Sequence, residues 1–162
     1  MSRLAFIERA ASWYLSRWST TRAHLRKLLM KRVQKRVLPE EHAAAIAEVE
    51  AVLDRCERAG LVDDAAYAES KVARMIARGV SAPVIRARLA AKGLTRIAMP
   101  DDAAFTSCCA YVLRRRLGPL RDDAAAHREK DLARIGRAGF SYEIARRVLA
   151  MDPDEIRSVT AR

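Results

Sequence analysis

A period of sixty residues recurs along this chain and restricts its fold more than any other feature of the sequence. Four positions return in three copies without a gap: Thr21, Leu25, Arg26 and Leu29; Ser81, Ile85, Arg86 and Leu89; and Ser141, Ala145, Arg146 and Leu149. Self-similarity at a fixed period is typical of repeat proteins, whose units bury their apolar faces against one another. The period therefore predicts tandem modules.

The modules are expected to be helical. Apolar residues recur three and four positions apart, as in Leu25, Leu28 and Leu29, and no stretch alternates polar and apolar residues as a strand would. We predict an all-α fold of tandem three-helix repeats that forms an elongated, curved helical array. Three modules are expected, over residues 1–60, 61–118 and 119–162, and the third is truncated and ends in a short C-terminal tail.

Proline, glycine and capping residues predict the helix ends. The expected helices cover about residues 3–17, 21–36, 39–59, 64–78, 81–92 and 100–118. A basic linker then leads to two final helices. Residues 151–162 are expected to form a loose tail.

The charge of the chain is high and unevenly distributed. The formal net charge is +11, and residues 1–38 carry ten Lys or Arg and one acid. Residues 39–69 carry two basic and nine acidic residues, whereas 70–100 carry seven basic residues and no acid. Two basic surfaces separated by an acidic element are therefore expected, and their field should attract nucleic acid or an acidic protein surface.

The cysteines and the N-terminus indicate an intracellular location. Cys56, Cys108 and Cys109 lack the spacing of a zinc site or a disulfide framework, so reduced and mostly buried thiols are expected. The apolar run from Leu4 to Ile7 is too short for a signal peptide or a membrane span. We expect a cytoplasmic monomer that does not bind a membrane.

The sequence offers no recognisable catalytic centre. His24, His42 and His127 have no metal-binding spacing, and no phosphate-binding glycine loop is present. The paired acids at 63–64 and 101–102 stand where helices begin, so capping explains them more simply than a metal site does. We predict no enzymatic activity, no catalytic residue, no metal and no cofactor.

Basic residues gather at helical spacing and form the best candidate binding surface. Lys71, Arg74 and Arg78 share one face of a predicted helix, opposite its apolar residues. The other candidates are Arg86, Arg88 and Lys92, then Arg22 and Arg26, the stripe Lys27, Lys31 and Lys35, and the cluster Arg114, Arg115 and Arg116. Such side chains contact phosphates without reading sequence. The simpler interpretation of each stripe is a solvated helix face.

The aromatic residues favour packing over binding. Only 6% of residues are aromatic, so stacking platforms for bases are sparse. Trp13, Tyr14 and Trp18 are therefore interpreted as core and turn residues. Pairs of helices also suggest a helix-turn-helix protein in outline, but no single recognition helix stands out.

Several runs of residues resemble the RecX family. The central module carries the strongest match, in Leu61 to Ala68 (LVDDAAYA), Gly79, and Ser81 to Gly93. The later runs RRRLGP at 114–119 and RAGFSYEIARRVL at 137–149 are similar too. The first module departs from the pattern, because Lys31 and Arg32 stand where a Lys-Gly helix end is expected.

The resemblance implies a regulator of recombination and DNA repair that binds RecA. Such a protein would lie in the groove of the RecA–DNA filament and restrain ATP turnover, filament extension and strand exchange. The resemblance implies no catalytic residues. Binding is expected to be spread over Lys71, Arg74, Arg86, Arg88 and Lys92. The resemblance carries the same role less directly to Arg22, Arg26 and Arg114 to Arg116.

Two other functions remain open from the residues themselves. A general DNA-binding protein would bind single- or double-stranded DNA directly, without RecA. A helical-repeat scaffold would pair its basic stripes with the carboxylates of an acidic protein partner and would have little affinity for DNA.

Overall fold

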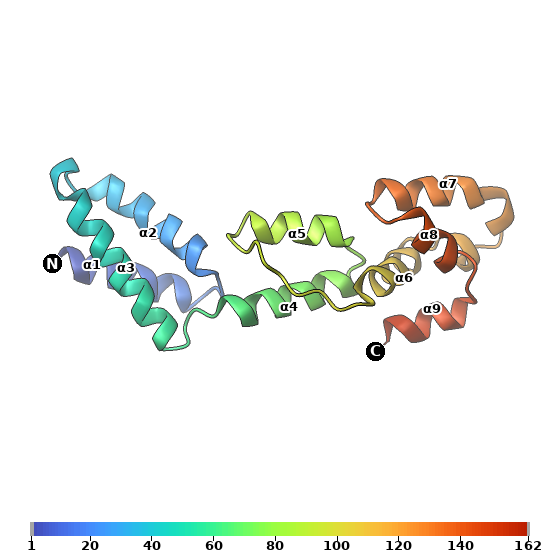
Figure 1. The fold of residues 1–162 in the computed structure, drawn as a ribbon, viewed down its shortest axis with the longest axis horizontal. Helices are drawn as coiled ribbons and strands as arrows, with labels where there is room; N and C mark the ends of the chain where they lie inside the picture. Colours follow the sequence, from blue (N-terminus) through green and yellow to red (C-terminus); the bar gives the residue numbers. More distant parts are fainter. Residues whose placement is uncertain (1, 162) are drawn as a thin grey trace. The chain divides into compact units, whose positions relative to one another are not determined.

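A computed structural model describes residues 2–161, and these residues form helices joined by turns and loops (Figure 1). They contain nine α-helices, two 3₁₀ turns and no β-strand. The prediction of an all-α fold is therefore confirmed. The chain divides into two compact units: unit 1 holds residues up to 68 together with 90–95, and unit 2 holds 69–89 and the residues from 96 onward. This boundary crosses the predicted second module, so the division into three modules stays a prediction.

Unit 1 is built around three packed helices. They are α1 (Arg3–Leu15), α2 (Arg22–Arg36) and α3 (His42–Arg58), and α3 is entered through the 3₁₀ turn η1 (Pro39–Glu41). Ile7, Leu25 and Leu53 are completely enclosed between them, as the helical spacing of apolar residues predicts. Each such side chain contributes about 1.5–3 kcal/mol when fully buried, which makes this stripe the main source of stability in the unit.

The start of α2 is held by residues from later in the chain. The buried hydroxyl of Thr21 donates to the carbonyl oxygen of Lys92 at 2.6 Å and accepts from the amide of His24 at 3.1 Å. The carboxylate of Asp64, the first residue of α4 (Asp64–Ala77), accepts from the amide of Arg22 at 2.8 Å. Two amides that the helix itself leaves without a partner are thus satisfied.

Glycine is required where the segment after α5 (Ala82–Ala90) approaches α2. Gly93 has φ +86°, and a Cβ atom there would lie 2.4 Å from the Cβ of Ala23. A side chain at this position would therefore combine backbone strain with a collision. The end of the central module at Lys92 and Gly93 therefore allows the chain to approach α2 at Ala23.

Unit 2 has α6 (Ala103–Arg115) at its centre. The helices α8 (Tyr142–Val148) and α9 (Pro153–Thr160) pack against α6, and α7 (Ala124–Arg137) packs against α8 and the 3₁₀ turn η2 (Gly118–Leu120). Their common core is fully enclosed and consists of Cys108, Cys109, Val112, Ile135, Val148 and Ile156.

Buried polar side chains join the turns of unit 2. The hydroxyl of Ser81 donates to the carbonyl oxygen of Ala138 at 2.7 Å, and that of Ser107 donates to Val80 at 2.6 Å. The enclosed carboxylate of Asp131 accepts from the amide of Gly118 at 2.8 Å. Because each group is buried, each of these bonds fixes the position of a turn.

The end of the chain corrects one prediction. Residues 151–162 were expected to form a loose tail after two final helices, but residues 153–160 form a third helix, α9. Asp152 caps it in a reciprocal pair with Glu155, and Pro153 stands in its first turn. Ile156 anchors α9 in the core of unit 2. The expectation of a loose tail is therefore wrong over these residues.

Three positions of the sixty-residue period have matching environments, and the first differs, because Thr21 and Ser81 are buried and Ser141 is exposed. The side chains of Thr21 and Ser141 cap their helices, and Leu25, Ile85 and Ala145 are all buried. The fourth members, Leu29, Leu89 and Leu149, are buried as well. The arginines at 26, 86 and 146 are exposed. Three of the four recurrent positions thus serve capping and packing.

Candidate functional site

The basic residues of α2 fall into two groups, and the first group already has partners. Arg22 contacts Glu50 at 2.9 Å, Asp54 at 2.8 Å and Glu57 at 2.6 Å, all on α3, and Arg26 also contacts Glu50. Partial burial alone would lower the pKa of Arg22, but these hydrogen bonds and charges outweigh it and raise the pKa. The acidic block of the sequence therefore neutralises part of the basic block before it.

The second group on α2 is uncompensated. Lys27, Lys31 and Lys35 are exposed and stand one helical turn apart. Within residues 2–161, no carboxylate lies within ion-pair distance of these three amines. Their charge is available to an external anion.

The central basic residues are exposed but do not share one face. Arg74 on α4, Arg78 after it, and Arg86 and Arg88 on α5 are all solvent-exposed, whereas Lys71 is half-buried. Residues two positions apart in a helix are separated by about 200° around its axis. Arg86 and Arg88 therefore flank the buried stripe of Ile85 and Leu89 on opposite sides. The predicted stripe is therefore a broad basic region over α4 and α5.

Lys92 belongs to unit 1, whereas Arg74, Arg78, Arg86 and Arg88 belong to unit 2. Its amine lies 3.4 Å from Nε2 and 3.5 Å from Nδ1 of His24. Burial, followed by the charges of Lys92 and Lys27, lowers the pKa of His24, so the imidazole stays neutral beside the ammonium group at neutral pH. Lys92 thus has a structural contact in addition to its predicted binding role.

The arginine cluster at 114–116 ends α6. All three side chains are exposed, and Arg116 has the left-handed backbone that ends the helix, with φ +51°. Arg115 and Arg116 line a cavity of about 660 Å³ together with Arg121 and Arg134. Arg121 is paired with Asp123 at 2.5 Å and lies 3.5 Å from Asp131. The sequence located this cluster but could not reveal Arg134 of α7 and Arg121, which follows η2.

The aromatic residues near the end of α1 correct a second prediction. Trp13, Tyr14 and Trp18 were expected as core and turn residues, and Trp18 does lie in the connection between α1 and α2. The side chains of Trp13 and Trp18 are nevertheless 46% and 47% exposed. Their ring centroids lie 5.5 Å apart in an edge-to-face contact, and Tyr14 lies 5.1 Å from Trp18. Sequence reasoning missed this surface because it assigned these aromatic residues to core and turn packing. Their position where α1 ends was the signal that could have revealed it.

The groups considered for catalysis are separated or inert. The three histidines have different partners: Lys92 for His24, the carbonyl of Val37 for His42 and Asp123 for His127. No group of three potential metal ligands occurs within the described part of the chain. Burial raises the pKa of Cys108 to about 12 and that of Cys109 to about 11, so neither is a reactive thiolate at neutral pH.

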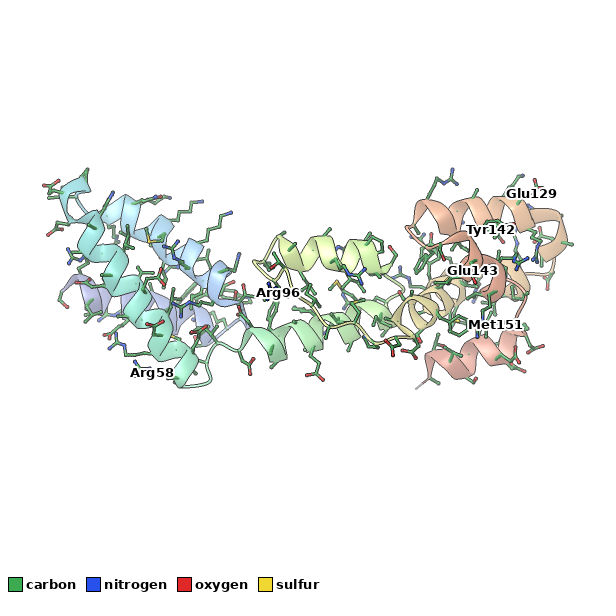
Figure 2. The ribbon with its side chains drawn as sticks, in the orientation of Figure 1. Arg58, Arg96, Glu129, Tyr142, Glu143 and Met151 are labelled. Atoms are coloured by element: carbon green, nitrogen blue, oxygen red, sulfur yellow. The ribbon has the colours of Figure 1, made fainter. Side chains whose placement is uncertain are left out.

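Figure 2 labels two further cationic side chains, Arg58 at the end of α3 and Arg96 in the segment after α5.

No helix within residues 2–161 has the length and apolar composition needed to cross a membrane.

Comparison with known proteins gives no matching family model and no matching solved structure. Curated proteins do match, over most of their length. A regulatory protein RecX of Myxococcus xanthus is 33% identical over 91% of this chain and 86% of its own. Regulatory proteins RecX of Stenotrophomonas maltophilia and Thermobifida fusca are 31% and 32% identical, over 83% and 88% of this chain and 82% and 78% of their own. Near-complete coverage at this identity assigns the family, and the chain belongs to the RecX family of regulatory proteins.

Proposed function

We propose that this protein regulates homologous recombination and DNA repair by binding RecA and the RecA filament on DNA. In this proposal it inhibits the RecA ATPase, filament extension and strand exchange. The match to relatives named regulatory protein RecX carries the proposal. The protein acts by binding alone, as a monomer in the cytoplasm, without a cofactor or a reaction of its own.

The uncompensated charge over α4 and α5 supports this proposal. Arg74, Arg78, Arg86 and Arg88 are exposed, and within residues 2–161 no carboxylate pairs with them. Arginine binds phosphate and carboxylate groups through paired hydrogen bonds, and both groups occur on a protein filament assembled on DNA. We therefore propose these four residues as the principal contacts, with Lys71 and Arg114 to Arg116 as additional ones.

The remaining predicted contacts have internal partners. Arg22 and Arg26 face the carboxylates of α3, and Lys92 lies against His24. Recruiting them would break these pairs, so we propose for them a smaller share of the binding energy.

The test is the RecA ATPase on single-stranded DNA with increasing amounts of this protein. The unmodified chain is expected to slow ATP turnover. The double variant Arg74→Glu/Arg88→Glu should need an about tenfold or higher concentration for the same effect, since each lost charge-assisted bond costs about 1.5–3 kcal/mol. The matched control is Arg128→Glu/Lys130→Glu, which changes two exposed cations of α7 by the same charge.

The outcomes separate this function from the alternatives. Unchanged ATP turnover at saturating protein would contradict the proposal. Tight duplex binding together with unchanged turnover would favour a general DNA-binding protein, because the same cations suit phosphates. Little affinity for DNA or RecA would favour a scaffold for an acidic protein.

A further inference from the structure

Unit 1 exposes an aromatic and cationic surface where α1 ends and α2 passes it. We call it the tryptophan surface and define it as Trp13, Tyr14, Arg17, Trp18 and Arg32. Ring contacts connect its members: the Trp13 and Trp18 centroids lie 5.5 Å apart, and the Tyr14 and Trp18 centroids 5.1 Å apart. Although the core of unit 1 is closely packed, about half of each tryptophan remains in contact with solvent. Exposed apolar area gathered in one place marks an interaction site more often than isolated apolar residues do.

Two arginines extend this surface without neutralising it. The guanidinium carbon of Arg17 lies 4.6 Å from the centroid of the Trp13 ring, and that of Arg32 lies 5.4 Å from it. Arg17 also donates to the carbonyl oxygen of Trp13 at 3.1 Å. Among residues 2–161, no carboxylate stands within ion-pair distance of either guanidinium. The ring therefore positions two positive charges and leaves both available to an anion.

The charge of the surroundings selects an anionic ligand. Lys27, Lys31 and Lys35 add uncompensated positive charge along the solvent side of α2. The carboxylates of unit 1 that neutralise Arg22 belong to α3 and lie on the other side of α2. A ligand of the tryptophan surface must therefore combine negative charge with flat apolar groups.

We propose that the tryptophan surface binds an unpaired nucleic-acid strand, with a base stacked on Trp18 and the flanking phosphates held by Arg17 and Arg32. A single strand carries both chemical groups in alternation, and its bases offer open faces. A duplex keeps its base faces inside the stack, and an acidic peptide has carboxylates but few flat rings. The inference deepens the proposed function and rests on it for placing the chain beside DNA.

Intrinsic fluorescence gives a direct test, because the two tryptophans of the surface are the only two in the chain. Titration with an oligothymidylate, without RecA, should quench the tryptophan emission as bases stack. A duplex of the same length and a polyglutamate should quench it much less. Equal quenching by all three polyanions would overturn the proposal, since it would indicate charge alone.

Variants locate the contact. The affinity for a labelled oligothymidylate, measured by fluorescence anisotropy, should fall about 5- to 150-fold in Trp18→Ala, the range for losing one stacked base. Tyr142→Ala is the control, since Tyr142 is an aromatic residue of α8 in unit 2 that is 69% exposed (Figure 2). An unchanged affinity in a Trp18→Ala protein with native helix content would overturn the proposal.

A second pair of variants guards against misfolding. Trp18→Phe keeps a ring and should keep most of the affinity. Arg17→Gln/Arg32→Gln keeps both tryptophans and should reduce the slope of log affinity against log salt by about 1.4, because each phosphate contact on a single strand contributes about 0.7. An unchanged slope would refute the role of the arginines. The strand-binding assay contains no RecA, so it tests this inference independently of the proposed function. A variant that loses strand binding and still inhibits the RecA ATPase would separate the two.

Discussion

Two glycines of unit 1 share a left-handed backbone and differ in their surroundings. Gly60 has φ +67° and ends the turn after α3, where an added Cβ atom would have no neighbour within 4 Å. At Gly93, with φ +86°, the same atom would lie 2.4 Å from Ala23. The backbone requirement is common to both. The steric requirement applies to Gly93 alone.

Replacing each glycine with alanine should separate these two effects. Gly60→Ala is expected to lower the free energy of unfolding by about 1–2 kcal/mol, the cost of a left-handed L-residue. Gly93→Ala should cost more, because α2 or the segment after α5 must move to admit the methyl group. Chemical denaturation of both variants measures the difference. Equal costs would show that α2 yields to the added methyl without penalty.

His24 should make the stability of unit 1 depend on pH. Burial and the nearby Lys92 and Lys27 lower its pKa in the folded chain, so the unfolded chain binds the proton more readily. Its contribution is therefore complete above the ordinary histidine pKa of about 6.5 and is lost as the pH falls toward the lower, folded pKa.

The variant His24→Gln should weaken this pH dependence. Between about pH 7 and pH 5, the free energy of unfolding is expected to fall less steeply in the variant than in the parent. Measurement at about pH 8, where the imidazole is neutral in both states, gives the cost of the substitution itself. Parallel curves over the whole range would contradict the role of His24.

At the same scale, the sequence indicates what type of group stands at a position but not what it meets. Arg22 and Arg26 were predicted as binding residues, and their ion pairs with α3 depend on the angle at which two helices pack. Trp13 and Trp18 were assigned to core and turn packing, and about half of each side chain is exposed where α1 ends. Both differences arise from tertiary contacts, on which residue type and spacing depend only weakly.

At the scale of elements, helix ends were the more predictable feature. Asp63 caps its helix as expected, because its side-chain oxygen accepts an amide that a helix cannot satisfy itself. Thr21 and Ser141 cap α2 and α8 in the same way. Gly60 and Gly93 end helical segments with the left-handed backbone that other residues avoid. These determinants are local, so the sequence displays them directly.

The helix α9 was missed although its start is also local. Asp152 and Glu155 form a capping box, and Pro153 stands in the first turn. The helix has only eight residues, and one of them, Ile156, is fully buried. With so few apolar positions, a helical period is hard to recognise, and its stability comes from packing against α6 rather than from propensity.

Ile156→Ala should therefore destabilise unit 2. Removing this enclosed side chain is expected to cost about 2–5 kcal/mol, because it leaves a cavity between α9 and α6. Ser158→Ala, on the exposed side of the same helix, should cost far less. Thermal or denaturant unfolding compares the two. Similar losses in both variants would mean that α9 adds little to the core.

At the scale of the whole molecule, the net charge of +11 hides an internal division. The acidic block at 39–69 supplies Glu50, Asp54 and Glu57, which hold Arg22 and Arg26. Lys27, Lys31 and Lys35 on the same helix have no such partners within residues 2–161. The position of the carboxylates, rather than the number of basic residues, thus decides which part of the chain can attract a polyanion.

This division can be tested with two variants of equal net charge. The triple variant Glu50→Gln/Asp54→Asn/Glu57→Gln raises the formal charge from +11 to +14 and releases Arg22 and Arg26. The control Glu40→Gln/Glu69→Gln/Glu129→Gln reaches the same charge by neutralising three exposed acids on other elements. A field that depended on net charge alone would make the two proteins bind DNA equally.

We expect the first variant to bind DNA more tightly than the control and with a steeper salt dependence. Two released arginines that contact phosphates would add about 1.8 to the slope of log affinity against log salt on duplex DNA. The same variant should lose some stability, about 0.2–1 kcal/mol for each partly exposed ion pair removed. Anisotropy titrations at several salt concentrations measure the slope. Equal slopes for the two proteins would mean that Arg22 and Arg26 cannot reach DNA even when they are released, and that the acidic block acts on the long-range field alone.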